Sequence, residues 1–242
     1  MTTGHDVAVI DAEPDEHGLT MRDPVRGIVF IGVARTRRPM RQRSSLAHEI
    51  AHVLFGDWNR CEDLSARSME EIRADSFARH LLVPLDGLRE FLGDRESVSE
   101  ADLSATVQRF LASPAIVSIA LHDCGYIDTP TKTRWMSLST PQLATRFGWS
   151  DQYHSLQEDS NRTRPPQRLL ARAISGYEEG VVTTQTIATL RGISAEHAAA
   201  ELADAGVVPH DYVIPSLSAE DLPVVDVDLS DLDEPNPSEP NE

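Results

Sequence analysis

Near the N-terminus, apolar and polar positions alternate in the short period of β-strands. The segments DVAVID at residues 6–11 and LTMRDPVRGIVFIGVA at residues 19–34 are rich in β-branched residues. The Asp-Pro-x-x-Gly sequence inside the second segment is typical of a turn between two strands. We therefore expect a short hairpin, and with it a small antiparallel sheet, ahead of the first helix.

After residue 43 the apolar positions follow the helical period, and two helices are predicted. The first begins at a capping serine, Ser44 or Ser45, and stops at Gly56, a residue suited to the left-handed position after a helix. The second extends over about residues 65–82 and is ended by Pro84.

Between the sheet and the first predicted helix lies RTRRPMRQR, residues 35–43, which contains five arginines. The pattern has no apolar period, and we interpret it as a solvated loop. The alternative is a contact surface for an acidic partner or for nucleic acid, because clustered arginines attract phosphates and carboxylates.

Two later stretches, residues 101–127 and 183–208, share one helical rhythm. In each, a serine is followed eight residues later by leucine and twelve residues later by glycine. This spacing is typical of a helix-turn-helix unit, in which a second helix closes at the glycine. The intervening residues 128–165 are polar and marked by prolines, and we predict that they form a linker. Residues 166–210 are predicted to form a small helical domain.

The composition is that of a globular protein, with 242 residues of which 40% are hydrophobic. The formal net charge of -17 opposes general binding to nucleic acid. More than half of this charge lies in residues 218–242, which contain nine acids and no base. Such an acidic, proline-rich end buries little apolar surface, so we expect residues 211–242 to be disordered.

The cysteines and the absence of long apolar runs indicate in which cellular compartment the protein is expected. Cys61 and Cys124 stand in unrelated contexts, which argues against a disulfide framework of the secreted kind. The N-terminus lacks the basic and apolar regions of an export signal, and no stretch approaches eighteen apolar residues. We therefore expect a cytoplasmic protein with no membrane contact.

The segment SLAHEIAHVLFGD, residues 45–57, carries the clearest chemical pattern. His48 and His52 are four residues apart, so a helix places them on one face, where both ring nitrogens can bind one ion. Glu49 follows His48 directly, so it lies about 100° further round the helix axis and stands beside that ion. This is the position of a general base that activates a water molecule. We therefore predict a zinc centre with Glu49 as the catalytic residue.

A catalytic zinc site usually has three protein ligands and one open position. The best candidate for the third ligand is Glu71, because it lies on the next predicted helix. Asp75 follows one turn later on the same face, and a carboxylate there typically orients a ligand imidazole. The small side chains of Ala47 and Ala51 leave room for the second helix to approach closely.

Other interpretations of these residues remain. The metzincin pattern fails, because Phe55 replaces its glycine and Trp58 replaces its third histidine. The sequence Ser68-x-x-Glu71 also fits a capping box, in which the Glu71 side chain would bind the helix backbone instead of a metal. His80 lies more than two turns beyond Glu71 and is predicted to pack or to face the substrate.

The two helix segments resemble the ImmA/IrrE family of metallopeptidases. That family reads R-F-T-x-A-H-E-x-x-H and then E-x-x-A-[ND]-x-F-A-x-x-L-L-x-P, and this chain has RSSLAHEIAH and EIRADSFARHLLVP. Ser44 and Ser45 stand where the family has phenylalanine and threonine. The resemblance covers about residues 6–127, and it implies a metallopeptidase domain over residues 1–127.

The resemblance implies an α+β fold with a zincin-like core, in which the small sheet packs on the HExxH helix and the following ligand helix. It implies zinc ligation by His48, His52 and Glu71, with Glu49 as the catalytic acid and base. It also implies a protein substrate, a helix-turn-helix repressor or regulator encoded beside the peptidase.

Two other functions fit parts of the sequence. The helical units could read DNA while the zinc site is structural or vestigial, but the second unit, residues 183–208, has one arginine, no lysine and an acidic, alanine-rich second helix. Such a helix is poorly suited to phosphates or to guanine edges. The units could also dock a partner protein, which is compatible with a peptidase.

Overall fold

The structure is a computed structural model that describes residues 5–12, 18–58 and 68–210. Within these ranges the chain has an α+β fold with three strands and eleven helices. The acidic tail predicted to be disordered, residues 211–242, lies outside the described residues.

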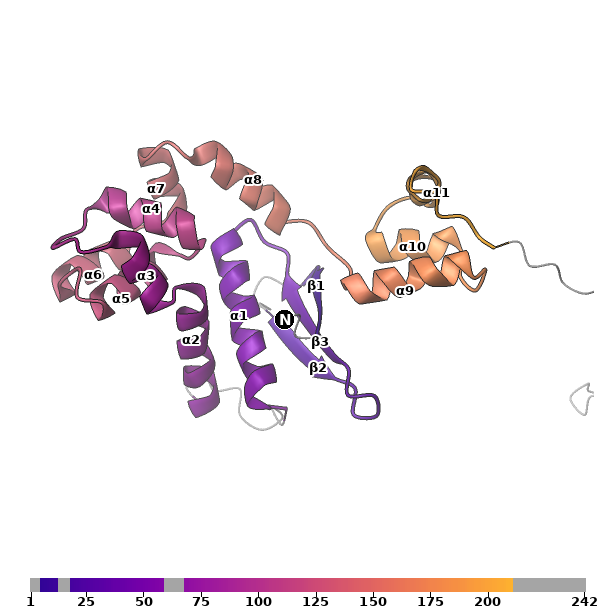
Figure 1. Cartoon of the computed structure of the whole chain (residues 1–242), viewed down its shortest axis with the longest axis horizontal. Coiled ribbons are helices and arrows are strands. Elements are labelled where there is room, and N and C mark those ends of the chain that lie inside the picture. The colour runs from indigo at the N-terminus through magenta and orange to yellow at the C-terminus, as the bar shows by residue number, and fades with distance from the viewer. Residues whose placement is uncertain (1–4, 13–17, 59–67, 211–242) are drawn as a thin grey trace, which may run out of the picture. The chain divides into compact units, whose positions relative to one another are not determined.

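A small sheet stands at the start of the chain (Figure 1). Its strands, in the spatial order β1-β3-β2, are β1 (Asp6–Ile10), β2 (Gly18–Arg22) and β3 (Val29–Ala34). β2 and β3 form the predicted antiparallel hairpin, and Asp23 Oδ1 accepts the turn N–H groups of Val25 and Arg26. β1 pairs with β3 in parallel, so the prediction of a wholly antiparallel sheet is wrong. The alternation of side chains indicates strands but not their direction.

Helix α1 (Pro39–Phe55) packs on β2 and β3, and it begins earlier than predicted. Its first residue is a proline, whose fixed φ suits the first helical position, and Arg38 precedes it without a side-chain cap. The supposed loop at residues 35–43 therefore includes the first turn of α1. The predicted end is confirmed, because Gly56 has a φ of 75° and donates to the His52 and Val53 carbonyls.

Helix α2 (Met69–Leu82) lies beside α1 in Figure 1. The predicted start at residue 65 falls outside the described residues, and the described helix has Ser68 as its N-cap. Small buried side chains on both helices allow the backbones to approach closely. These side chains are Ala47 and Ala51 on α1, and Ala74 and Ala78 on α2.

Residues 128–165 are not a linker. After α3 (Leu85–Leu92), α4 (Glu100–Phe110) and α5 (Pro114–Asp123), they form α6 (Thr129–Met136), α7 (Thr140–Arg146) and α8 (Ser150–Ser160). Trp135, Leu143 and Trp149 enter the same hydrophobic core as α1 to α5, and the Trp149 indole N–H donates to Ser104 Oγ at 2.9 Å. The prediction failed because these apolar residues are few and widely spaced among polar ones.

The C-terminal helices have a hydrophobic cluster of their own. They are α9 (Gln167–Glu178), α10 (Thr184–Arg191) and α11 (Ala195–Asp204), and Ile187, Ala188 and Ala198 are buried among them. The two stretches of shared rhythm each contain two helices joined by a short turn, α4 with α5 and α10 with α11. Their identity as helix-turn-helix units stays a prediction.

Among the residues that the structure describes, no single helix is long and apolar enough to cross a membrane. Helices α4 and α5 reach sufficient length and apolar content only when taken together, and the chain bends by 110° between them. Both helices contribute side chains to the hydrophobic core.

Truncation of a core residue in α7 measures how much residues 128–165 contribute to the fold. Leu143 is fully buried, so Leu143→Ala should lower the free energy of unfolding by about 2–5 kcal/mol. Urea denaturation followed by circular dichroism provides the measurement. Leu169→Ala, at a half-exposed position on α9, is the matched control and should change stability by less than about 1 kcal/mol. Equal, small effects of both substitutions would contradict the assignment of α7 to the core.

Candidate metal centre

The HExxH residues lie in the middle of α1, where regular helical geometry fixes their spacing. His48 and His52 point the same ring atom at each other, and their Nε2 atoms are 3.0 Å apart. His52 is 1% exposed and His48 is partly exposed. The predicted histidine pair is thus brought together on one face of the helix.

Glu71 reaches this pair from α2. Its Oε2 lies 3.0 Å from His48 Nε2, and its Oε1 lies 3.5 Å from His52 Nε2. One ligand atom from each of the three residues lies within 4.8 Å of the other two. Two imidazole nitrogens and a carboxylate that converge in this way can hold a metal ion.

Glu71 also takes part in the N-terminal cap of α2, but through its backbone and not through the side chain that the capping alternative invoked. The Ser68 side chain accepts the backbone N–H of Glu71 at 3.3 Å. That bond uses only the backbone of Glu71, and its carboxylate contacts the histidines. Capping and ligation are therefore compatible, because they use different groups of the same residue.

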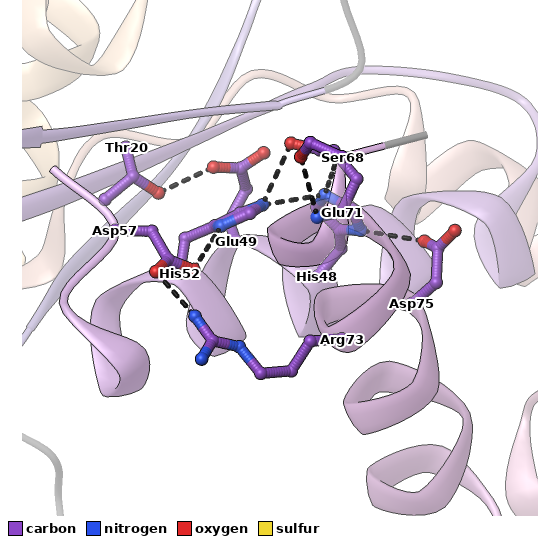
Figure 2. A network of polar contacts seen from close by, with 9 residues as sticks. All are labelled: Thr20, His48, Glu49, His52, Asp57, Ser68, Glu71, Arg73 and Asp75. Carbon is purple, nitrogen blue, oxygen red and sulfur yellow. Dashed lines mark hydrogen bonds and ion pairs between the residues drawn. The ribbon is translucent and has the colours of Figure 1, made fainter. Parts of the chain in front are cut away.

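A carboxylate stands at the outer nitrogen of each histidine (Figure 2). His48 Nδ1 lies 2.9 Å from Asp75 Oδ1, and His52 Nδ1 lies 3.0 Å from Asp57 Oδ2. A carboxylate accepts a proton, so it favours the tautomer in which Nδ1 carries the hydrogen and Nε2 has a free lone pair. Two such lone pairs facing each other repel, unless a cation lies between them.

Asp57 was not identified from the sequence as part of the site. The left-handed conformation of Gly56 turns the chain back, and the Asp57 N–H donates to the His52 carbonyl at 3.0 Å. An acid directly after the glycine that ends a ligand helix is the signal that could have identified it.

Arg73 of α2 holds Asp57 from the other side. Arg73 Nη2 donates to Asp57 Oδ1 at 2.7 Å, and its guanidinium lies 4.3 Å from the centre of the Phe55 ring. Burial alone raises the pKa of the Asp57 carboxyl, but hydrogen bonds and charge from His52 and Arg73 together lower it. Asp57 therefore stays ionised and keeps its acceptor oxygens available to His52.

Glu49 is held beside the histidines by strand β2. It is only 5% exposed, and its Oε2 accepts a hydrogen bond from Thr20 Oγ1 at 2.7 Å. A Cβ atom on Gly18 would come within 2.9 Å of Glu49 Cγ, so only glycine leaves space there. Neither β2 residue was identified from the sequence, since the contacts span about thirty positions of the chain.

His80 does not join this group. Its Nδ1 donates to the Ser76 carbonyl one turn earlier in α2, at 2.8 Å. The orientation is that of a helix surface residue and agrees with its exclusion from the predicted ligands.

Removal of the Glu71 carboxylate should impair metal binding. Loss of a residue that only orients a ligand lowers metal affinity roughly 10–100-fold. Glu71→Gln should weaken Zn²⁺ affinity by more than this, because the substitution removes a charged ligand. Competition with a chromophoric chelator gives the affinity. Glu70→Gln makes the same change at the adjacent, exposed position and should leave the affinity unchanged. Unchanged affinity in Glu71→Gln would exclude Glu71 as a ligand.

Comparison with known families agrees with this geometry. Residues 3–122 match the family model described as the IrrE N-terminal-like domain of a peptidase family. The matched range contains the sheet, α1 and α2, and hence every residue of the metal centre. No match was found among curated proteins or among solved structures. Through residues 3–122, the chain belongs to the ImmA/IrrE family of peptidases.

Proposed function

We propose that this protein is a zinc-dependent endopeptidase. The observation that carries the proposal is the convergence of His48, His52 and Glu71 with the Glu49 carboxylate held beside them. Ligands about 2.0–2.2 Å from a tetrahedral zinc ion are about 3.3–3.6 Å apart. The separations among the two histidine Nε2 atoms and the Glu71 carboxylate oxygens are 3.0 to 3.5 Å. They fit such an ion with little adjustment.

Peptide hydrolysis at this site would use Glu49 as both base and acid. Zinc, when bound, activates a water molecule and polarises the scissile carbonyl. Glu49 accepts a proton as the water oxygen bonds to the carbonyl carbon, and delivers that proton to the amide nitrogen as the C–N bond breaks. The hydrogen bond from Thr20 restricts the rotation of this carboxylate and so supports the proposed role.

The substrate that we propose is a helix-turn-helix transcriptional repressor or regulator encoded beside the peptidase and cleaved in the cytoplasm. Support for it comes from the family relationship. Cleavage of such a regulator would couple the peptidase to transcription without any contact between the peptidase and DNA.

The structure offers little support for direct DNA reading by α10 and α11. Arg191, the one basic residue besides histidine in this helix pair, forms an ion pair with Glu201. Glu196 lies in the first turn of α11, the end that commonly meets DNA in such units. A reading helix of this charge repels phosphates.

Replacement of the catalytic glutamate separates chemistry from metal binding. Glu49→Gln should slow cleavage of the regulator encoded beside the peptidase by at least about 100-fold, the usual contribution of a general base. The variant protein should still bind about one zinc ion per chain. Gel analysis of timed digests and atomic absorption provide the two readouts. Glu90→Gln, on the exposed side of α3, should cleave at the normal rate. A Glu49→Gln protein with full activity would exclude this mechanism.

The support from β2 can be tested at Thr20. Thr20→Val keeps the shape of the side chain but removes the hydroxyl, and it should lower kcat roughly tenfold or more, the effect of losing a hydrogen bond to a charged group. Thr20→Ser retains the hydroxyl and should recover most of the rate. The zinc content of both variants should equal that of the unmodified protein. A rate that depends on side-chain shape, with Val active and Ser inactive, would contradict a positioning role.

A further inference from the structure

A concave site separate from the metal centre lies at the opposite end of α1 from its capping glycine. It is a cavity of about 540 Å³, bounded by the first turns of α1 and α5 and by residues of α7 and α8. Arg38 is the N-cap of α1 and lies ten residues before His48. At 1.5 Å per helical residue, the cavity is about 15 Å along α1 from the metal centre. The two sites are therefore distinct.

The charged side chains that line the cavity are all arginines, Arg37, Arg38 and Arg41. They come from the arginine-rich segment at residues 35–43, which the metal centre does not use. Within the described residues, neither Arg37 nor Arg38 forms an ion pair. Among the described residues, Arg37 and Arg38 therefore make the local charge positive, although the chain as a whole is acidic.

The two helix ends at the cavity add to this positive potential. Neither α1 nor α5 has an acidic residue in its first turn, and α1 has no side-chain cap. The first N–H groups of a helix have no acceptor within the helix, and its N-terminus carries a partial positive charge. The lining residues Met40 and Ala115 belong to these first turns.

Two nearly buried residues that carry hydroxyl groups also line the cavity. Tyr153 is 5% exposed and Thr140 is 7% exposed, and no hydrogen bond of either side chain is found within the described residues. Burial raises the pKa of the Tyr153 hydroxyl, and the positive charge of Arg38 opposes that rise, so the guanidinium lies near this group. A hydroxyl at the cavity that lacks an internal partner can donate a hydrogen bond to a bound molecule.

We propose that this cavity binds a phosphate-bearing small molecule of about mononucleotide size. Guanidinium groups match phosphate oxygens, and the hydroxyls and helix N–H groups supply further donors to the same anion. The volume lies within the 300–1,000 Å³ range of small-molecule pockets.

Calorimetric titration of the full-length protein with inorganic phosphate, AMP and ATP tests the proposal. At least one of these probes should bind saturably, with one site per chain. Arg38→Gln and Tyr153→Phe should each weaken that binding about tenfold or more, the loss expected for a hydrogen bond to a charged group. Arg172→Gln makes the same charge change on the exposed side of α9 and should have no effect.

Several results would overturn the proposal. One is a lack of saturable binding of all three probes at millimolar concentrations. Another is equal weakening by Arg38→Gln and Arg172→Gln, which would indicate a general charge effect. Binding of duplex DNA that Arg38→Gln abolishes, without binding of the small probes, would assign the arginines to nucleic acid. Thermal melts monitor folding, and Thr140→Val replaces Tyr153→Phe if the latter is unstable.

Discussion

The contact between Glu71 on α2 and the two histidines on α1 is the interaction on which the rest of the site depends. Neither helix alone holds three metal ligands. The contact forms because alanines on both helices allow the backbones to lie close together, and because Ser68 starts α2 just one turn before Glu71. A larger residue at Ala47 or Ala51 would separate the helices and withdraw the third ligand.

Negative charge around the histidines is concentrated to a degree that a metal ion explains. Glu49, Asp57, Glu71 and Asp75 surround the pair, and Arg73 is the single cation among the residues drawn in Figure 2. Carboxylates this close repel one another, and Glu49 and Asp57 are largely removed from water. A divalent cation would offset this repulsion, so metal binding would also stabilise the pairing of α1 with α2.

Local patterns predicted the parts of the site that lie within single helices. The four-residue spacing of His48 and His52 and the helix that carries Glu71 were evident from the sequence, and so was the stop at Gly56. Contacts between distant segments were not. Thr20 and Gly18 contact Glu49 only because β2 packs against α1. The alternation of side chains along a strand does not indicate which element packs against it.

The interpretation of residues 128–165 failed for a related reason. Trp135, Leu143 and Trp149 are separated by polar residues, so the segment has a weak apolar period although each of these side chains is buried. Their burial depends on the surfaces that α4 and α5 present, as the hydrogen bond between Trp149 and Ser104 illustrates. A few large aromatic side chains bury enough apolar surface to hold a segment against the core, even when its average composition is polar.

Like charges gather at two places along α1, its first turn and the surroundings of its histidines. Arginines at its N-terminus oppose the helix dipole, at a cost of about 0.3–1 kcal/mol for each nearby charge, and the carboxylates around its histidines repel one another. Stability alone would favour an acid at the first turn and fewer acids near the histidines. A cation bound among the carboxylates would be attracted to each of them, and an anion bound among the arginines would be attracted to each guanidinium. Each bound ion would thus offset the repulsion between the like charges. The same physical argument therefore supports a metal centre in the body of α1 and an anion site at its start.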